Sequence, residues 1–198
     1  CTNTEGGYTC ECPTGYSGVN CDAPLIYEII ATQELQPVDE EGTATGSKKT
    51  YKTIRIKYKS PKGSNQKNLY SIYGTAGYPL QCPPAFQVGE PFGASIGGVD
   101  PAFFELNANS EFDSWLTVGI TDGSSPGAMT ISPGADGAGA VTAWSESSRF
   151  YTEDGAIFWM VPADGPAIDP QGDPITIAQL TIPTDTVDDL NFKVGLEG

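Results

Sequence analysis

The stretch Tyr51-Lys-Thr-Ile-Arg-Ile-Lys-Tyr-Lys59 alternates between apolar and basic side chains along its second half. Successive side chains of a β-strand point to opposite faces of a sheet, so the apolar set shares one face and the basic set shares the other. The apolar set is Ile54, Ile56 and Tyr58, and the basic set is Arg55, Lys57 and Lys59. The pattern predicts a strand that is apolar towards a core and basic towards solvent.

Further short runs of β-branched and aromatic residues lie on both sides of this strand, separated by turns rich in Gly, Pro and Asp. The further expected strands are 25–32, 68–75, 102–106, 111–121, 129–132, 141–145, 155–161, 175–182 and 190–195. Parallel sheets need crossover connections, usually helices, and the sequence shows no convincing amphipathic helix. We therefore predict an all-β domain, built as an antiparallel β-sandwich or jelly roll.

The length of 198 residues suffices for a short N-terminal module, expected at 1–24, and one larger domain, expected at 25–198. The sequence has no run of about eighteen apolar residues, so no membrane span is predicted. It does not open with a charged and then apolar leader, so we expect the export signal to lie upstream or to have been removed.

The charges are separated along the chain. The net charge is −15, yet eight of the ten basic residues lie between Lys48 and Lys67, a window without Asp or Glu. One interpretation is that both regions are solvated faces, where exposed lysines also deter edge pairing between sheets. The other is that Arg55, Lys57 and Lys59 form an assembly surface for the acidic surface of another copy. Nucleic acid is not expected as a partner, because the acidic body repels phosphates.

Four of the five cysteines lie within the first 21 residues, at Cys1, Cys10, Cys12 and Cys21. This segment is rich in Gly and has no apolar run to bury, so it needs disulfides to hold a shape. Its composition predicts an oxidising, extracellular location.

The spacing of these cysteines is accompanied by aromatic and glycine motifs. The motifs are C-x8-C-x-C-x8-C, Gly6-Gly7-Tyr8 and Gly15-Tyr16-Ser17-Gly18. Together they resemble the C-terminal half of an EGF-like domain, over residues 1–22. The resemblance implies a disulfide between Cys12 and Cys21. It also implies that Cys1 and Cys10 pair with cysteines ahead of residue 1, either in a longer form of this chain or in a neighbouring molecule.

In EGF-like domains, the pattern formed here by Cys1, Asn3, Tyr8 and Cys10 marks β-hydroxylation and often calcium binding. The resemblance makes Asn3 a candidate calcium ligand. Calcium takes six to eight oxygen ligands, and the carboxylates that the family places ahead of its first cysteine are not in this sequence, so an Asn in a polar turn is the alternative. Ser17 lies where the family carries an O-linked sugar, which makes it a candidate glycosylation site.

The fifth cysteine, Cys82, lies in a separate segment that contains two prolines. In a secreted protein, a leftover cysteine indicates either a disulfide to another segment or chain, or a buried thiol that acts as a small hydrophobe. Within the chain, Cys1 and Cys10 are the available partners. The sequence leaves both alternatives open.

The chain contains no histidine, which excludes Ser-His-Asp and Cys-His catalysis and removes the commonest zinc ligand. A glycosidase needs only a facing pair of carboxylates. Candidates for such a pair are Glu105, Glu111, Asp113, Glu146 and Glu153. Among 25 acidic residues, the presence of candidates decides nothing, so no residue is assigned a catalytic role and an enzyme is not predicted.

A lectin-like domain that binds glycans with the help of calcium is the alternative function. It would use exposed aromatic side chains and acidic turns. The aromatic candidates are Trp115, Trp144, Trp159 and Tyr151, and the Asp-Gly turns begin at 122, 136, 154 and 164. The competing interpretation places Trp115 and Trp159 in the core and takes Asp-Gly as ordinary turn chemistry.

The function favoured by the sequence is structural: an extracellular subunit of a filament, flagellar hair or cell-surface coat that binds copies of itself or related proteins. The partial EGF-like pattern, the leftover Cys82 and the separated charges are its basis. The segments 113–121 and 155–162 also resemble those of EGF-bearing secreted proteins of microalgae and other protists, among them the shaft proteins of tubular flagellar hairs (mastigonemes). This resemblance assigns no residue a role.

Overall fold

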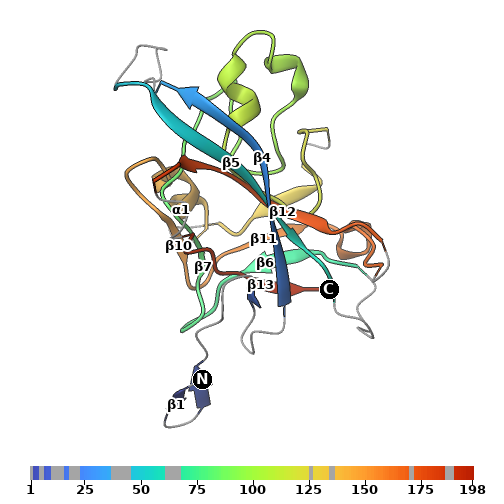
Figure 1. The fold of residues 1–198 in the computed structure, drawn as a ribbon. Helices are drawn as coiled ribbons and strands as arrows, with labels where there is room; N and C mark the ends of the chain where they lie inside the picture. The colour runs from blue at the N-terminus through green and yellow to red at the C-terminus, as the bar shows by residue number, and fades with distance from the viewer. Residues whose placement is uncertain are drawn as a thin grey trace.

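The structure is a computed structural model of the chain. It describes residues 25–36, 46–60, 68–124, 127–133, 137–169, 172–185 and 190–198, together with the backbone of 2–4, 7–9, 16–17 and 23–24. Strands dominate these residues and every sheet is antiparallel (Figure 1). The predicted all-β class is therefore confirmed.

The larger sheet has five strands in the order β3-β4-β5-β12-β8. Their bounds are β3 (Tyr16–Ser17), β4 (Ala23–Leu35), β5 (Lys49–Tyr58), β12 (Ile175–Pro183) and β8 (Trp115–Leu116). β5 is the alternating strand predicted at 51–59, and it is paired along both edges. Its apolar set is at most 4% exposed, whereas its basic set is only half-buried, as the alternation predicted.

The second sheet has four strands in the order β13-β6-β11-β9. Their bounds are β13 (Gly195–Glu197), β6 (Ser71–Tyr73), β11 (Ala156–Trp159) and β9 (Met129–Ile131). Two smaller sheets pair β1 (Thr2–Thr4) with β2 (Gly7–Thr9), and β7 (Leu80–Cys82) with β10 (Phe150–Thr152). The sequence patterns had not indicated β7 or β10, each of which is three residues long.

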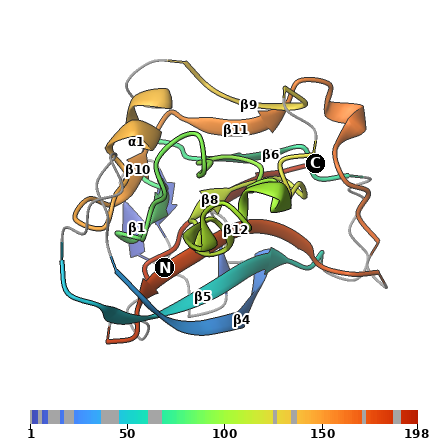
Figure 2. The same cartoon turned by 90° about the horizontal axis from the view of Figure 1, so that it is seen from above.

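The two larger sheets lie on opposite sides of one hydrophobic core, as Figure 2 shows with β5 and β12 on one side and β6 and β11 on the other. Ile56 and Leu180 enter this core from the first sheet, and Ile72 and Ile157 enter it from the second, each with 0% of its surface exposed. A fully buried aliphatic side chain contributes roughly 1.5–3 kcal/mol. This shared core is therefore what holds the two sheets together.

Strand β4 contains a bulge in its pairing with β5. Ile29 lies opposite Ile54, and Ala31 lies opposite Thr53. Ile30, between them, is therefore an extra residue without a partner on β5. An extra residue reverses the face on which the following side chains lie.

Because of this reversal, the two ends of β4 are buried on opposite faces of the sheet. Leu25 is 6% exposed and belongs to the main core. Leu35 is 4% exposed and joins Tyr51 and Phe86 in a second, smaller cluster. In that cluster, the rings of Tyr51 and Phe86 meet edge to face at 5.6 Å between centroids.

The expected strand at 102–106 is wrong, because this segment forms the 3-10 helix η1 (Pro101–Phe103) and a turn. The Asp100 carboxylate accepts a hydrogen bond from Ala102 N at 2.9 Å, and Pro101 at the first helical position fixes a helical φ. The expected strand at 111–121 is reduced to β8, and the 3-10 helix η2 (Ala108–Phe112) leads into it.

The expected strand at 141–145 is also wrong, because most of it lies in the short helix α1 (Ala138–Ala143). The chain enters this helix at Gly137, where a Cβ atom would lie 1.8 Å from the carbonyl oxygen of Ser132. A third 3-10 helix, η3 (Pro162–Asp164), follows β11. Among the described residues, no helix has both the length and the apolar character needed to cross a lipid bilayer.

The core predicts a large difference between two isoleucines of neighbouring strands. Ile56→Ala removes a side chain that is 0% exposed, so we expect the free energy of unfolding to fall by about 2–5 kcal/mol. Ile26→Ala is the matched control: this side chain is 41% exposed and its loss should change stability by less than about 1 kcal/mol. Urea unfolding followed by tryptophan fluorescence measures both, and equal losses would contradict the assignment of the core.

Candidate functional site

The basic set of β5 is engaged within the chain itself. Lys57 Nζ lies 2.5 Å from Glu28 Oε2 on the neighbouring β4. The hydrogen bond and charge of Lys57 hold the pKa of Glu28 below its usual value. Lys59 Nζ donates a hydrogen bond to the carbonyl of Gly172. Two of the three cations predicted as an assembly surface therefore already have partners in their own molecule.

Three other lysines lie at the start of β5, at the end farthest from Lys57 along the strand. Lys48 and Lys49 are exposed and Lys52 is half-buried. Within the described part of the chain, none of the three has an ion-pair partner. Positive charge that is open to another molecule is therefore concentrated here.

Strand β4 is an edge strand over most of its length. One edge is paired with β5, and on the other edge β3 covers only Ala23 and Pro24. From Leu25 to Leu35, no other described strand pairs with this second edge. Three isoleucines near it are exposed, Ile26 at 41%, Ile29 at 54% and Ile30 at 42%. An apolar, unpaired edge of this length is a surface on which another strand can add.

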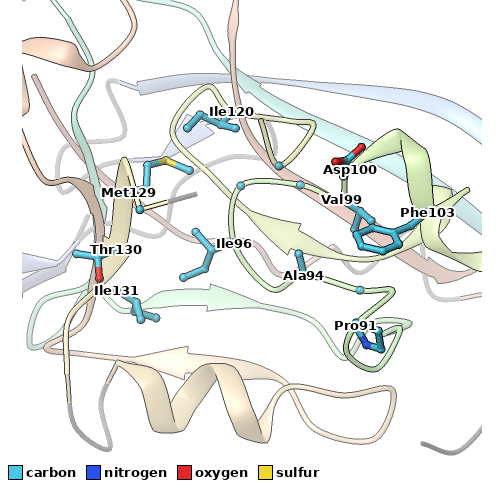
Figure 3. Close-up of a pocket in the computed structure, with 15 residues that line it drawn as sticks. Pro91, Ala94, Ile96, Val99, Asp100, Phe103, Ile120, Met129, Thr130 and Ile131 are labelled. Atoms are coloured by element: carbon cyan, nitrogen blue, oxygen red, sulfur yellow. The ribbon is translucent and has the colours of Figure 1, made fainter. Parts of the chain in front are cut away.

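A cavity of about 470 Å³ lies beside the edge of β9, between segments that are distant in the sequence (Figure 3). The described residues that line it are Pro91, Gly93, Ala94, Ile96, Gly97, Gly98, Val99, Asp100, Phe103, Ile120, Gly123, Gly127, Met129, Thr130 and Ile131. Among them, Asp100 alone is ionisable. Apart from Asp100 and the hydroxyl-bearing Thr130, the walls are apolar side chains and glycine backbone.

The glycine backbone allows the cavity walls to approach one another closely. Gly98 has φ of 82°, and a Cβ atom there would lie 2.2 Å from the backbone of Thr121. A side chain at this position would therefore both strain the backbone and collide with the next segment. No local sequence pattern marks this cavity, because its walls come from three segments that only the fold brings together.

A buried carboxylate lies behind one wall of the cavity. Asp113 is 0% exposed and accepts hydrogen bonds from the backbone N–H groups of Val88 at 2.8 Å, Ala94 at 2.7 Å and Ser114 at 2.9 Å. Burial raises the pKa of Asp113 to about 7, while these three N–H groups act in the opposite direction. The carboxylate therefore fixes both ends of the loop that forms this wall.

Gln179 connects Asp113 to the first sheet. Its Nε2 donates to the carbonyls of Asp113 at 2.9 Å and Glu111 at 3.1 Å. Its Oε1 accepts from Arg55 Nε at 3.1 Å, and the Arg55 guanidinium lies 5.9 Å from the centroid of the Trp115 ring. Arg55, the third residue of the predicted assembly surface, is thus part of an internal hydrogen-bonded network.

The candidate carboxylates for a glycosidase do not share one environment. Asp113 is buried, whereas Glu105, Glu111, Glu146 and Glu153 are exposed. Glu146 accepts a hydrogen bond from the Tyr51 hydroxyl at 2.5 Å, and Glu153 accepts one from Gly77 N at 3.4 Å. In the described part of the chain, no group of three or more Cys, Asp or Glu residues is placed to hold a metal ion.

The tryptophans predicted as sugar-binding candidates lie mainly in the interior. Trp115 and Trp144 are 2% and 4% exposed, and Trp144 Nε1 donates to the Pro83 carbonyl at 2.9 Å. Trp159 is half-buried against the core, and its Nε1 donates to Val118 O at 2.9 Å. The interpretation of Trp115 and Trp159 as core residues is therefore confirmed.

The remaining aromatic and acidic-turn candidates lie at the surface. Tyr151 is 38% exposed and lies under the Arg149 guanidinium at 4.7 Å. Asp122 caps its own turn by accepting from Ser124 N at 3.0 Å, so this Asp-Gly pair has the ordinary turn role. The turn at 136 lies outside the described residues.

Cys82 is a free thiol, fully buried on β7. Burial raises the pKa of this thiol well above its usual value. Its position matches the alternative of a small buried hydrophobe rather than that of a disulfide. A thiol in this position is shielded from exchange with other chains.

Most candidates of the N-terminal segment lie beyond what the structure describes. Cys1, Cys10, Cys12 and Cys21 are outside the described residues, so their predicted pairing stays a prediction. For two further candidates the backbone alone is described: Asn3 lies in β1, opposite Tyr8 of β2, and Ser17 lies in β3. The proposed calcium and sugar attachments likewise stay predictions.

Comparisons of the chain with models of protein families, with curated proteins and with solved structures found no match. The functional proposals below therefore rest on the sequence and on the described geometry.

The burial of Asp113 predicts a pH dependence of stability. Its pKa is about 7 in the folded protein and about 3.9 in an unfolded chain. Between these values the folded state holds a proton that the unfolded state has lost, so the free energy of unfolding falls as pH rises. From pH 5 to 7 this group should lower it by about 2 kcal/mol.

Asp113→Asn removes this titration. Between pH 5 and 7 we therefore expect the free energy of unfolding of the variant to fall by about 2 kcal/mol less than that of the wild type. The variant should also be less stable at both pH values, because an amide cannot accept all three N–H groups. Asp122→Asn is the control, since its exposed carboxylate should leave the pH slope unchanged over this range. Denaturant unfolding at pH 5 and pH 7 measures the change in the free energy of unfolding. An equal change in wild type and Asp113→Asn would contradict the prediction.

Proposed function

We propose that the chain is a structural subunit of an extracellular assembly, such as a filament, a flagellar hair or a cell-surface coat. In this proposal a partial EGF-like module precedes a β-sandwich domain, and the subunit associates with copies of itself or with related proteins. The observation that carries it is the edge of β4 that no described strand pairs with from Leu25 to Leu35, together with its three exposed isoleucines. The cysteine-rich first segment supports the extracellular setting.

An open strand edge presents a row of backbone N–H and C=O groups that another strand can pair with. Soluble proteins usually protect such an edge with charges, prolines or very short strands. The edge of β4 is long, and beside Glu28 and the bulge it carries the exposed side chains of Ile26, Ile29 and Ile30. Side chains of a second molecule that paired here would cover these isoleucines, and removing their surface from water would stabilise the contact.

The distribution of charge supports association between unlike surfaces. The lysines at the start of β5, Lys48, Lys49 and Lys52, have no ion-pair partner among the described residues. The net charge of the chain is −15, so the rest of another copy carries an excess of negative charge. Attraction between these surfaces would direct the approach of two subunits and would weaken with salt.

The isoleucine edge gives the main test of this function. Replacing Ile26, Ile29 and Ile30 together by Thr keeps the branched shape and the strand preference but removes apolar surface. Each isoleucine buried in a contact is worth roughly 1.5–3 kcal/mol, so dissociation constants should rise about tenfold or more. Sedimentation velocity over a range of protein concentrations measures the change.

The matched control is the double variant Met160→Thr and Val161→Thr, which removes two other side chains that are 60% and 52% exposed. It should leave the sedimentation behaviour unchanged. The proposal fails if wild type stays monomeric at high concentration and low salt, or if the triple variant associates as well as wild type.

The lysines give a second test, in which two triple variants are compared. Replacing Lys48, Lys49 and Lys52 by Ser should abolish the salt dependence of association and leave the free energy of unfolding within about 0.5 kcal/mol of wild type. The measurements are sedimentation at low and high salt, and denaturant unfolding.

The comparison variant replaces Arg55, Lys57 and Lys59 by Ser. We expect it to affect stability more than association, because it leaves Gln179 Oε1 and the Gly172 carbonyl without their donors. Its free energy of unfolding should fall by about 1–3 kcal/mol. If only this second variant loses association, the assembly surface is formed by Arg55, Lys57 and Lys59 and not by the lysines at the start of β5.

A further inference from the structure

The cavity is bounded on one side by the edge of β9 that no described strand pairs with. The flanking hydrogen bonds of this strand run from Met160 N to Ala128 O and from Ser132 N to Ala156 O, each at 2.9 Å. Backbone groups in an antiparallel pair point alternately towards and away from the partner strand. The N–H and C=O groups of the intervening Met129 and Ile131 therefore point away from β11, on the side of the cavity.

A second segment, around Ile96, forms another wall; it pairs with β8, and its Gly97 and Gly98 also pair with residues 121–123. Leu116 N donates to Ser95 O at 3.0 Å, and Gly97 N donates to Leu116 O at 2.9 Å. In this parallel bridge the residue between the two contacts, Ile96, directs its own N–H and C=O away from β8. Ile96 lines the cavity, and Figure 3 shows it beside Thr130 and Ile131.

The space between these walls matches the chemistry of an extended polypeptide. Each wall presents backbone donors and acceptors, and most of the lining side chains are apolar, with Thr130 and Asp100 as the polar ones. The volume of about 470 Å³ lies within the range of about 300–1,000 Å³ that is usual for ligand pockets. Addition of a strand to an exposed sheet edge is a common mode of peptide recognition, in which backbone hydrogen bonds supply affinity and side-chain pockets supply specificity.

We propose that this cavity binds an extended segment of a partner protein, which adds a strand beside β9 and Ile96. Its side chains that face the cavity walls are small or β-branched and apolar. In the bound segment, a basic residue follows these side chains. It would pair with Asp100, the ionisable residue among the described lining residues, and it would be attracted by the net charge of −15 on the chain.

The basic character of the ligand argues for a different protein over a second copy. Among the described residues of this chain, eight are basic, and six of these lie at Lys48, Lys49, Lys52, Arg55, Lys57 and Lys59. Three of the six, Lys52, Arg55 and Lys57, lie within β5 beyond its first residue, and this strand is paired along both edges. A second copy thus has no free basic strand to offer from its described part.

The test uses the full 198-residue chain and a random heptapeptide library displayed on phage. Panning against the wild-type protein should enrich peptides with alternating β-branched residues and one Lys or Arg. Ala94→Phe fills the cavity and should weaken binding of the selected peptides by at least about tenfold, whereas Ala94→Ser leaves the cavity open and should bind them as wild type does. Circular dichroism establishes that both variants are folded.

Synthetic versions of the selected peptides extend the test without any change to the protein. N-methylation of single amides removes one backbone donor at a time, and at the central residues it should weaken binding about tenfold or more, as expected for a strand paired through its backbone. The proposal is overturned if no peptide is enriched, if the enriched peptides bind Ala94→Phe equally well, or if N-methylation has no effect. It is also overturned if Ala94→Phe reduces self-association of the chain, because the occupant would then be a second copy.

Discussion

The carboxylate of Asp113 is the interaction on which the cavity side of the molecule depends. An ionised group costs several kcal/mol to bury unless nearby groups compensate it, and here the N–H groups of Val88, Ala94 and Ser114 offset part of that cost. The dependence is mutual, since each of these donors would cost about 1–3 kcal/mol if it were left buried without an acceptor. Gln179 binds the Asp113 carbonyl as well, so the loop at the cavity, β8 and β12 are held by one network.

The exposed edge of β4 has its origin in the bulge at Ile30. The extra residue places Leu35 against Tyr51 and Phe86, where it is 4% exposed. Ile29, just before the bulge, still lies opposite Ile54, yet 54% of its surface is exposed. One strand thus serves two apolar clusters on opposite faces of the sheet, and its middle part is covered by neither. Exposure at this edge is a consequence of packing at the two ends of β4.

The sequence allowed β5 to be predicted in detail, because its alternation depends only on neighbouring residues. The faces of Ile56 and Lys57 follow from that alternation, whereas the pairing of Lys57 with Glu28 depends on the register of β4. Helix α1 was mistaken for a strand because its start is set by a turn that brings Gly137 close to the Ser132 carbonyl, and strand preferences do not reveal such a turn. The burial of Asp113 depends on tertiary packing, so nothing in the sequence separated this residue, 0% exposed, from the other acidic residues. The cavity was likewise hidden, since strand patterns do not reveal which edges stay unpaired.

The two proposed contacts lie on different sheets, with β4 at the edge of one and β9 at the edge of the other, on opposite sides of the molecule in Figure 2. This separation matters for assembly. Two copies that paired through β4 alone would form a closed, two-fold contact, and growth would stop at a dimer. A filament or coat needs a second contact with a different surface, and a partner strand at β9 would supply it without competing for β4. The unpaired edges of both sheets together therefore suit a subunit that joins neighbours on two sides.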